Sequence, residues 1–298
     1  MKQGNASLYA SHREPFLRDG VVFLEQALAP QHMQVVEDAF TWKLQNAGKS
    51  AEMFYPELGA TILQATGNSV AAPSFQQMLF ETPLTAVVAA LFDSDDVWYL
   101  EEQVWLKEGG AARRTPWHQD SSYYPFEGPK SVVLWIPLDD LKKENSLDVV
   151  RGSFKGKIFN GTAMDIDDDT LPLYSEDDLP RLPNIEKERD KWDIVSWPIK
   201  RGDILAFHSN ALHGGAPTAA GMRRRSLTLR FIGDDVKKTR RPQRRQGADS
   251  YAANAKKPDV AYADIEDSAA ISNLSLRIDH ALRPGEAVYR VGVPKVRG

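Results

Sequence analysis

The stretch RRSLTLRFI (residues 224–232) alternates between two kinds of side chain, with the period of a β-strand. Its mainly apolar face consists of Arg225, Leu227, Leu229 and Phe231. Its polar face consists of Arg224, Ser226, Thr228 and Arg230. The apolar face can pack into a hydrophobic core. The polar face would then point inward as well only if it lines a cavity.

Three further segments have strand patterns. From Val97 onward the period is two, with Glu101, Gln103, Trp105 and Lys107 on one side and Leu100, Val104 and Leu106 on the other. SVVLWIPL (131–138) is apolar throughout, as a strand covered on both faces would be, and GDILAFH (202–208) follows a Gly-Asp turn. Helical patterns precede these strands at 30–47 and from Pro83, where Thr82 is a possible cap. Helices followed by short strands predict an α+β, mainly β protein built on an antiparallel sandwich.

Two charged segments are ambiguous. Residues 155–195 contain DIDDD (165–169) and EDD (176–178) with little periodicity, which fits either a solvated insertion or an active-site lid. The basic run 237–245 fits either a surface segment or a contact with an anionic substrate or partner. The sequence shows no internal repeat and no domain boundary, so we expect one domain over 1–298. Its parts are a helical region of about 1–95, a core of about 96–235 and a C-terminal extension of 236–298.

Composition excludes several classes of function. The 298 residues are 42% hydrophobic and 26% charged, which is ordinary for a globular chain, and a formal charge of −4 argues against nucleic-acid binding. There is no cysteine, so any metal must be bound by His, Asp or Glu. The N-terminus has no signal-peptide pattern, and no run approaches the roughly 18 apolar residues of a membrane helix. We therefore expect a cytoplasmic protein without nucleic-acid or membrane partners.

The segment TPWHQDSSYYPF (115–126) contains the first candidate ligands. In an extended chain His118 and Asp120 point to the same side, so an imidazole and a carboxylate can meet one metal ion. Tyr123, Tyr124 and Phe126 come directly afterwards and would serve either as a substrate-pocket wall or as core aromatics.

His213, in HSNALHGG, provides a third ligand after a predicted strand and before a glycine-rich turn. Two imidazoles and one carboxylate leave three metal positions open, the pattern associated with non-haem iron(II) oxygenases. His208 is better explained as a structural residue at the end of its strand. The remaining histidines lack ligand-like neighbours and are expected on the surface or in the core; these are His12, His32 and His280.

Arg224 and Ser226 lie two residues apart on one side of their strand. A guanidinium fork and a hydroxyl in this arrangement suit the distal carboxylate of a small dicarboxylate. Spacing alone leaves Arg223 and Arg225 as alternatives for the same role.

Together, these motifs resemble the phytanoyl-CoA dioxygenase family of Fe(II)- and 2-oxoglutarate-dependent oxygenases. The matching blocks are TPWHQD (115–120), VLWIPLDDLKKENSLDVVRGS (133–153), GDILAFHSNALHGG (202–215) and RRRSLTLRFIGDD (223–235). The resemblance implies a double-stranded β-helix, also called a jelly roll or cupin-like core, with flanking N-terminal helices. It also implies Fe(II), 2-oxoglutarate as cosubstrate and O2.

By position, the resemblance makes His118, Asp120 and His213 the iron ligands and Arg224 the partner of the cosubstrate. Gln103 and Trp135 resemble family positions that line the cosubstrate pocket, and Gln119, which lies between two ligands, is expected to contact the same pocket. Because relatives that halogenate have a small residue at this position, the aspartate at 120 favours hydroxylation or another oxidation. The runs Asn145-Ser146 and 151–154 depart from the family pattern and leave the substrate unassigned.

Three functions remain open. The first is a dioxygenase that hydroxylates an unactivated C–H bond of a small molecule. The second is a metal-dependent hydrolase or isomerase, since the same ligands also suit zinc. The third is a binding protein without turnover on the same fold. Arg224 favours the first because a hydrolase needs no dicarboxylate clamp, and all three metal ligands are present. The oligomeric state is not indicated.

Overall fold

The computed structural model describes residues 8–47, 51–54, 59–165, 167–174, 179–242, 255–256, 286 and 294–297. Its α-helices are α2 (Arg13–Asp19), α3 (Pro30–Gln45), α4 (Pro73–Glu81) and α5 (Leu84–Phe92). Short 3-10 helices are η1 (Ala10–His12), η4 (Asp120–Ser122), η5 (Lys143–Asn145), η6 (Ser153–Lys155) and η7 (Ile185–Lys191). The strands are β1 (Val21–Leu24), β2 (Ala51–Phe54), β3 (Thr61–Gly67), β4 (Val97–Glu108), β5 (Phe126–Glu127), β6 (Ser131–Pro137), β7 (Leu147–Val150), β8 (Ile194–Val195), β9 (Ile204–His208), β10 (His213–Gly215), β11 (Arg224–Ile232), β12 (Lys237–Lys238), β13 (Ala255–Lys256) and β14 (Lys295–Arg297).

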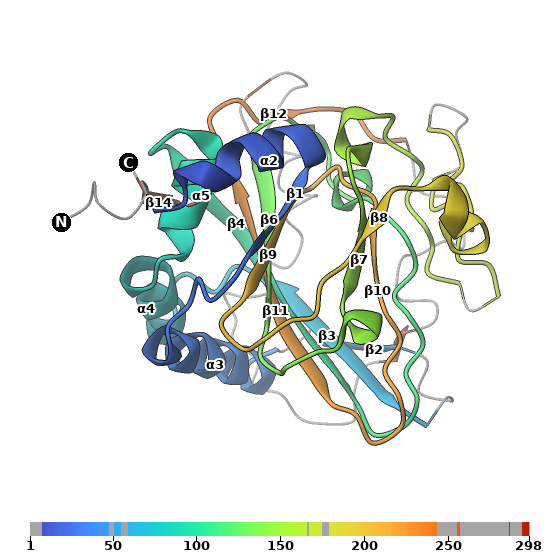
Figure 1. The fold of residues 1–298 in the computed structure, drawn as a ribbon, viewed down its shortest axis with the longest axis horizontal. Coiled ribbons are helices and arrows are strands. Elements are labelled where there is room, and N and C mark those ends of the chain that lie inside the picture. The colour runs from blue at the N-terminus through green and yellow to red at the C-terminus, as the bar shows by residue number, and fades with distance from the viewer. Residues whose placement is uncertain are drawn as a thin grey trace.

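Two antiparallel sheets form the frame (Figure 1). The large sheet has the order β1-β9-β6-β11-β4-β3-β2-β13, with β14 added beside β4, and the small sheet has the order β10-β7-β8. The chain passes from the large sheet at β6 to the small one at β7, returns at β9, crosses again at β10 and returns at β11. This alternation confirms the predicted jelly roll.

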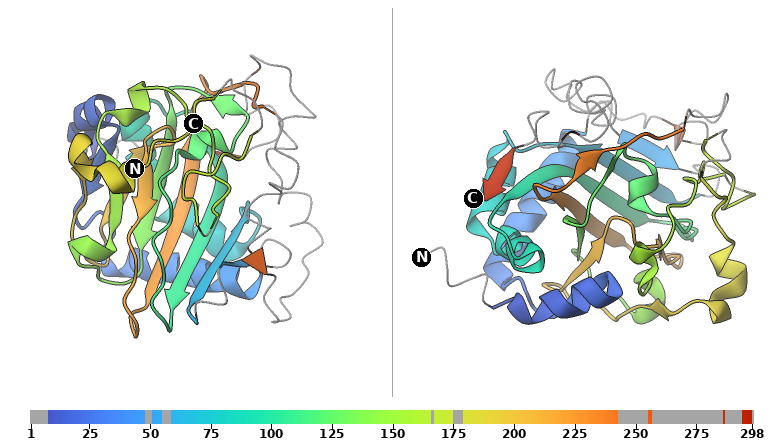
Figure 2. Two further views of the ribbon diagram at one scale, coloured as in Figure 1. Left: turned by 90° about the vertical axis from the view of Figure 1, so that its right-hand side faces the viewer. Right: turned by 90° about the horizontal axis from the view of Figure 1, so that it is seen from above.

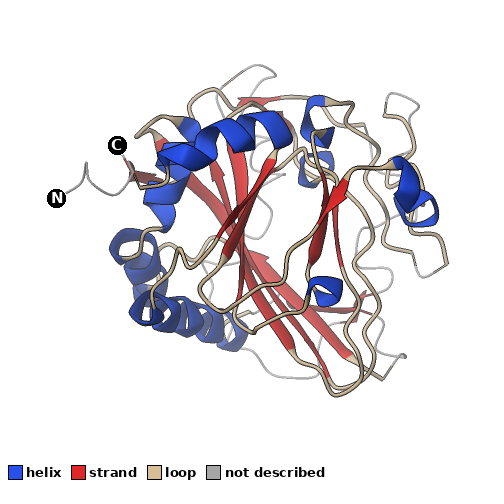
Figure 3. Ribbon diagram, viewed as in Figure 1, coloured by secondary structure: helices blue, strands red, loops and turns tan. Residues whose placement is uncertain are grey.

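The helices cover one face of the large sheet, and the small sheet lies on its other side (Figures 2 and 3). Strand β6 shows why its sequence is apolar throughout. Its side chains Val132 and Leu134 join the core beneath the helices, while Val133 and Trp135 join the apolar cluster toward the small sheet. The expectation of a strand covered on both faces is confirmed.

Strand β11 lies at the centre of the large sheet, between β6 and β4. Leu227, Leu229 and Phe231 pack into the core beneath the helices, as the alternation predicted. Because successive side chains on a strand point to opposite faces, the polar set that includes Arg224 and Arg230 points into the space between the sheets. The buried polar face therefore has a use, which is to line a cavity.

The predicted helices at 30–47 and from Pro83 are present as α3 and α5, but residues 1–95 are not only helical. Strands β1, β2 and β3 lie between the helices and join the large sheet through β9 and β4. Pro83 holds the N-cap position of α5, but the Thr82 hydroxyl accepts the Leu84 N–H at 3.4 Å, which is the kind of bond expected of a cap. The same hydroxyl donates to the Met78 carbonyl at 2.6 Å at the end of α4.

The C-terminal extension is described only in part. Within the predicted basic run, Lys237 and Lys238 form β12, whereas residues 243–245 lie outside the described residues, as does EDD (176–178). Among the described helices, none is long and apolar enough by itself to cross a membrane. The helices α4 and α5 meet that criterion only as a pair, with a bend of 51° between them.

Candidate metal and cosubstrate site

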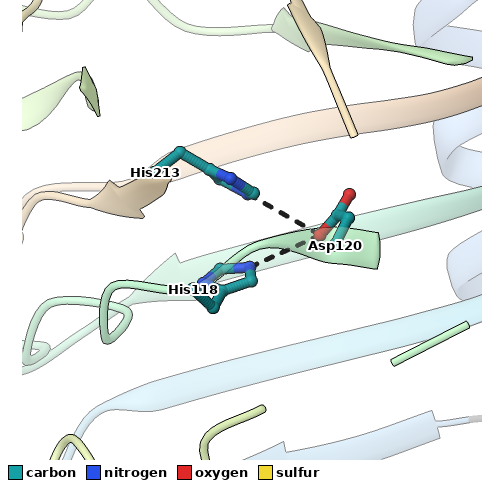
Figure 4. A group of neighbouring side chains, drawn as sticks. All are labelled: His118, Asp120 and His213. Atoms are coloured by element: carbon teal, nitrogen blue, oxygen red, sulfur yellow. Dashed lines mark ion pairs between the residues drawn. The ribbon is translucent and has the colours of Figure 1, made fainter. Parts of the chain in front are cut away.

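The structure brings His118, Asp120 and His213 together (Figure 4). Asp120 begins η4, and His213 begins β10. The backbone N–H of each histidine donates to the carbonyl of the other at 2.9 Å, so an antiparallel bridge fixes the two chains side by side. Nε2 of His118 and Nε2 of His213 lie 3.5 and 3.7 Å from Oδ1 of Asp120. Three buried donor atoms therefore face one point.

Both imidazoles are oriented for ligation through Nε2. Nδ1 of His118 lies 2.8 Å from the Pro116 carbonyl, and Nδ1 of His213 lies 3.0 Å from the Ala211 carbonyl. Because a carbonyl only accepts, each Nδ1 carries a proton, and Nε2 is the nitrogen that faces the site. Burial, together with the neighbouring His118, lowers the pKa of His213 to about 3, so this imidazole is neutral near pH 7.

Arg230 binds the other oxygen of the Asp120 carboxylate. Its Nε donates to Asp120 Oδ2 at 2.8 Å, and its Nη atoms donate to Glu101 and Gln103 at 3.2 and 3.0 Å. Burial alone would raise the pKa of Asp120, but the positive charge of Arg230 lowers it overall. Asp120 is therefore an anion with one oxygen, Oδ1, directed at the histidines.

This donor set fits a divalent first-row metal. Two neutral imidazole nitrogens and one carboxylate oxygen form the 2-His-1-carboxylate triad, which leaves coordination positions open for small molecules. All three donor atoms lie within 4.8 Å of one another, and all three residues are buried. The arrangement suits catalysis better than a purely structural site, in which the protein fills every position.

The triad opens into a cavity between the sheets. Its polar wall includes Arg224, Ser226, Thr228 and Arg230 from β11, Gln103 from β4, and Thr115. Its apolar wall includes Trp105, Trp135, Leu147 and Phe207. Gly215 keeps one part of the cavity open, because an added Cβ there would lie 3.0 Å from Arg224 Nη2 and 3.1 Å from Thr115 Oγ1.

Arg224 is a buried cation that bonds to backbone carbonyls rather than to a carboxylate. Nη1 donates to the carbonyls of Asn145 and Ala216 at 2.9 and 3.0 Å, and the buried Nε has no partner. Burial lowers the pKa of Arg224 to about 10. Lys107 lies directly opposite Arg224 on the neighbouring strand β4. Burial, and after it the charge of Arg224, lowers the pKa of Lys107. The buried guanidinium of Arg224 therefore carries a positive charge that an anionic ligand would neutralise.

The structure separates the three candidate arginines. Arg225 points away from the cavity and forms ion pairs with Asp139 and Glu37, and Arg223 is about half exposed beside Asp139. Arg224 alone of the three lines the cavity, with Ser226 next to it. The same cavity is lined by Gln103 and Trp135, and their contact with a cosubstrate stays a prediction.

Gln119 does not point into this cavity. Its side chain bonds to residues 157, 159 and 210, because a residue between two ligands on an extended segment points to the opposite side. Tyr123 and Tyr124 are also outside the set that lines the cavity. Tyr123 packs edge-on to His118, and the Tyr124 hydroxyl donates to Glu101.

The sequence analysis missed three residues around the cavity. Arg230 was placed on the correct strand face but given no role, Lys107 was treated as part of a strand pattern, and Thr115 was only part of a motif. The signal for Arg230 was available, since it shares the polar face of Arg224. His208 has the structural place expected of it, buried at the end of β9, where Nδ1 accepts the N–H of Asn210 at 3.0 Å.

Comparison with known proteins supports this description. The family model described as phytanoyl-CoA dioxygenase matches residues 16–226. Over 121 residues the chain is 26% identical to a probable alpha-ketoglutarate-dependent hypophosphite dioxygenase of Stutzerimonas stutzeri, covering 40% of each protein. Over 128 residues it is 24% identical to phytanoyl-CoA dioxygenase 1 of Oryza sativa subsp. japonica, covering 43% of this chain and 42% of that one. The matches span about two fifths of the length of these relatives.

Solved structures share the fold over most of the chain. The epimerase SnoN, solved with Fe3+, alpha ketoglutarate and nogalamycin RO, has a TM-score of 0.59 at 17% identity and covers 95% of this chain and 94% of its own. The alpha ketoglutarate dependent carbocyclase SnoK has a TM-score of 0.61 at 14% identity, covering 78% and 87%. AviO1 from Streptomyces viridochromogenes Tue57 has a TM-score of 0.55 at 24% identity, covering 75% and 94%. At these identities the likeness establishes the fold.

Proposed function

Because the chain belongs to the phytanoyl-CoA dioxygenase family, we propose that it is a non-haem Fe(II)- and 2-oxoglutarate-dependent dioxygenase. One observation carries the proposal. The His118–Asp120–His213 triad opens into a cavity whose wall includes Arg224, a buried arginine with an unpartnered Nε. A metal triad and an anion-binding group in one cavity are what an enzyme with a dicarboxylate cosubstrate requires.

The residues have separate tasks in this proposal. His118, Asp120 and His213 would hold the iron, and Arg224 with Ser226 would bind the distal carboxylate of 2-oxoglutarate. Bound iron and 2-oxoglutarate would supply activation of O2, with release of succinate and CO2. Trp135 and other apolar residues of the wall exclude water from the cavity, which protects the intended reaction.

We propose hydroxylation of an unactivated C–H bond of a small organic substrate as the outcome. An aspartate at position 120 supports it, since this carboxylate occupies the place that a halide would need. The names of the structural neighbours, an epimerase and a carbocyclase, show that one fold serves several oxidations, so fold alone does not select the outcome. We also propose that the protein works in the cytoplasm, without nucleic-acid or membrane partners.

A metal-dependent hydrolase or isomerase is the alternative to be tested, followed by a binding protein without turnover. The buried charge of Arg224 distinguishes these alternatives from the dioxygenase, because neither of them needs a dicarboxylate site beside the metal.

The test is an anaerobic titration of the protein with Fe(II) and 2-oxoglutarate, followed by succinate release in air. We expect a visible charge-transfer band and succinate formation. Asp120→Ala should abolish both, because it removes the only anionic ligand, whereas Asp234→Ala, which removes a half-exposed partner of Lys130, should keep both. Substantial turnover by Asp120→Ala would refute the triad, and metal binding without any band would favour the hydrolase.

A further inference from the structure

The side chain of Gln119 connects three parts of the chain behind the metal triad. Its Oε1 accepts the N–H of Phe159 at 2.8 Å. Its Nε2 donates to the carbonyl of Lys157 at 3.1 Å and to the carbonyl of Asn210 at 2.9 Å. With 1% of its surface exposed, Gln119 makes these bonds away from solvent. Because both the oxygen and the nitrogen of this buried amide are bonded, it holds the backbone at residues 157, 159 and 210 in fixed positions around Gln119.

One of these partners leads to the third ligand. Asn210 lies in the loop between β9 and β10, three positions before His213. In the same loop, the Ser209 carbonyl accepts the N–H of Ser121 at 3.0 Å. The segment of His118 and Asp120 is thus bonded to the loop of His213 on the side opposite the metal.

The other partners belong to the insertion at 155–195. The Ser122 hydroxyl donates to the Phe159 carbonyl at 3.0 Å, and the Tyr174 hydroxyl donates to the Ser122 carbonyl at 2.6 Å. Farther along, Trp117 Nε1 donates to Glu186 at 3.0 Å. The described residues of the insertion are absent from the cavity wall, yet several of them are buried, including Leu173 and Tyr174. Part of the insertion therefore packs against the segment that carries His118 and Asp120.

We propose that Gln119 is a positioning residue for the metal triad and that the insertion braces the ligand-bearing segment through it. Gln119 touches neither the cavity nor the donor atoms. It acts by holding the His118–Asp120 segment at a fixed distance from the loop of His213. Because the folded protein already holds the three ligands in place, metal binding does not have to order them, and the site binds metal more tightly. The inference rests on the proposed function only in that the triad takes a metal.

The test compares metal affinity in two variants that each lose a side-chain amide bonded to backbone. Gln119→Ala removes the brace. Asn68→Ala is the control, because its amide bonds to the carbonyls of Tyr99 and Leu100 at 3.3 and 3.0 Å, outside the contacts of the ligand segment. Co(II) is titrated into each folded protein under nitrogen, without cosubstrate. We expect the dissociation constant to rise about 10- to 100-fold for Gln119→Ala and to stay within about twofold for Asn68→Ala.

Two milder variants cover the case in which Gln119→Ala does not fold. Gln119→Glu keeps the acceptor but cannot donate to the two carbonyls, and Tyr174→Phe removes one bond from the insertion to Ser122. We expect the Co(II) dissociation constant to rise at least tenfold for the former and about threefold to tenfold for the latter. An unchanged constant in the folded Gln119 variants, or an equal rise in Asn68→Ala, would overturn the proposal. If the unmodified protein bound no Co(II), the proposed function would fail instead.

Discussion

Replacing Arg224 by lysine tests the cosubstrate site most directly. Nη1 of Arg224 is already committed to the carbonyls of Asn145 and Ala216, and its Nε and Nη2 remain for a ligand. A lysine has one nitrogen, so it cannot hold those carbonyls and also offer a planar fork to a carboxylate. Losing one charge-assisted hydrogen bond costs roughly 1.5–3 kcal/mol. At a tenfold change per 1.4 kcal/mol, the dissociation constant of 2-oxoglutarate should rise about 10- to 150-fold.

The neighbouring residue provides a matched control. Arg225 lies on the opposite face of β11 and pairs with Asp139 and Glu37, so Arg225→Lys makes the same chemical change outside the cavity. The assay is an equilibrium titration of 2-oxoglutarate into each Fe(II)-loaded protein under nitrogen. Arg225→Lys should bind like the unmodified protein. An Arg224→Lys constant within threefold of the unmodified value, or an equal loss in Arg225→Lys, would refute the assignment.

Two further predictions concern stability. Lys43 and Glu102 form an ion pair at 3.2 Å, with side chains only 2% and 0% exposed. Lys43→Met leaves the Glu102 charge buried without this partner, so it should lower the free energy of unfolding, measured in urea, by about 3–5 kcal/mol. Adding Glu102→Gln should restore much of that stability, and a loss below about 1 kcal/mol in Lys43→Met would contradict the prediction. Burial lowers the pKa of His208 from 6.5 to about 4, so the unfolded chain takes up a proton at a higher pH than the folded protein does. About 3 kcal/mol of the free energy of unfolding should therefore be lost as the pH falls from 6.5 to 4. His208→Gln should lose less over that interval, and parallel pH profiles of the two proteins would rule out this role.

Local periodicity made much of the site predictable. The alternation in 224–232 placed Arg224 and Ser226 together on a face that lines the cavity, because the pleat of a strand sets side-chain direction residue by residue. The same rule put His118 and Asp120 on one side of their segment and Gln119 on the other. The placement of Gln119 in the cosubstrate pocket came from proximity to the motif, and the geometry of the extended chain opposes it.

Short elements were less predictable. Strand β1 is only Val21–Leu24, and it is a strand because its backbone pairs with β9, some 180 residues away in sequence. Four residues contain too little periodicity to distinguish a strand from a connection between helices. Strand β3 likewise depends on its pairing with β4, and β2 pairs in turn with β3.

The sequence by itself determined which residue types can bind a metal and which of them share a face, and its resemblance to a known family implied the jelly roll. Only the tertiary structure decided that Arg230 binds Asp120, that Arg224 rather than Arg225 lines the cavity, and that the insertion packs behind the ligands. The reason is physical. Side-chain direction within a strand depends on neighbouring residues, whereas a contact between distant residues depends on sheet register and on where the chain crosses between sheets.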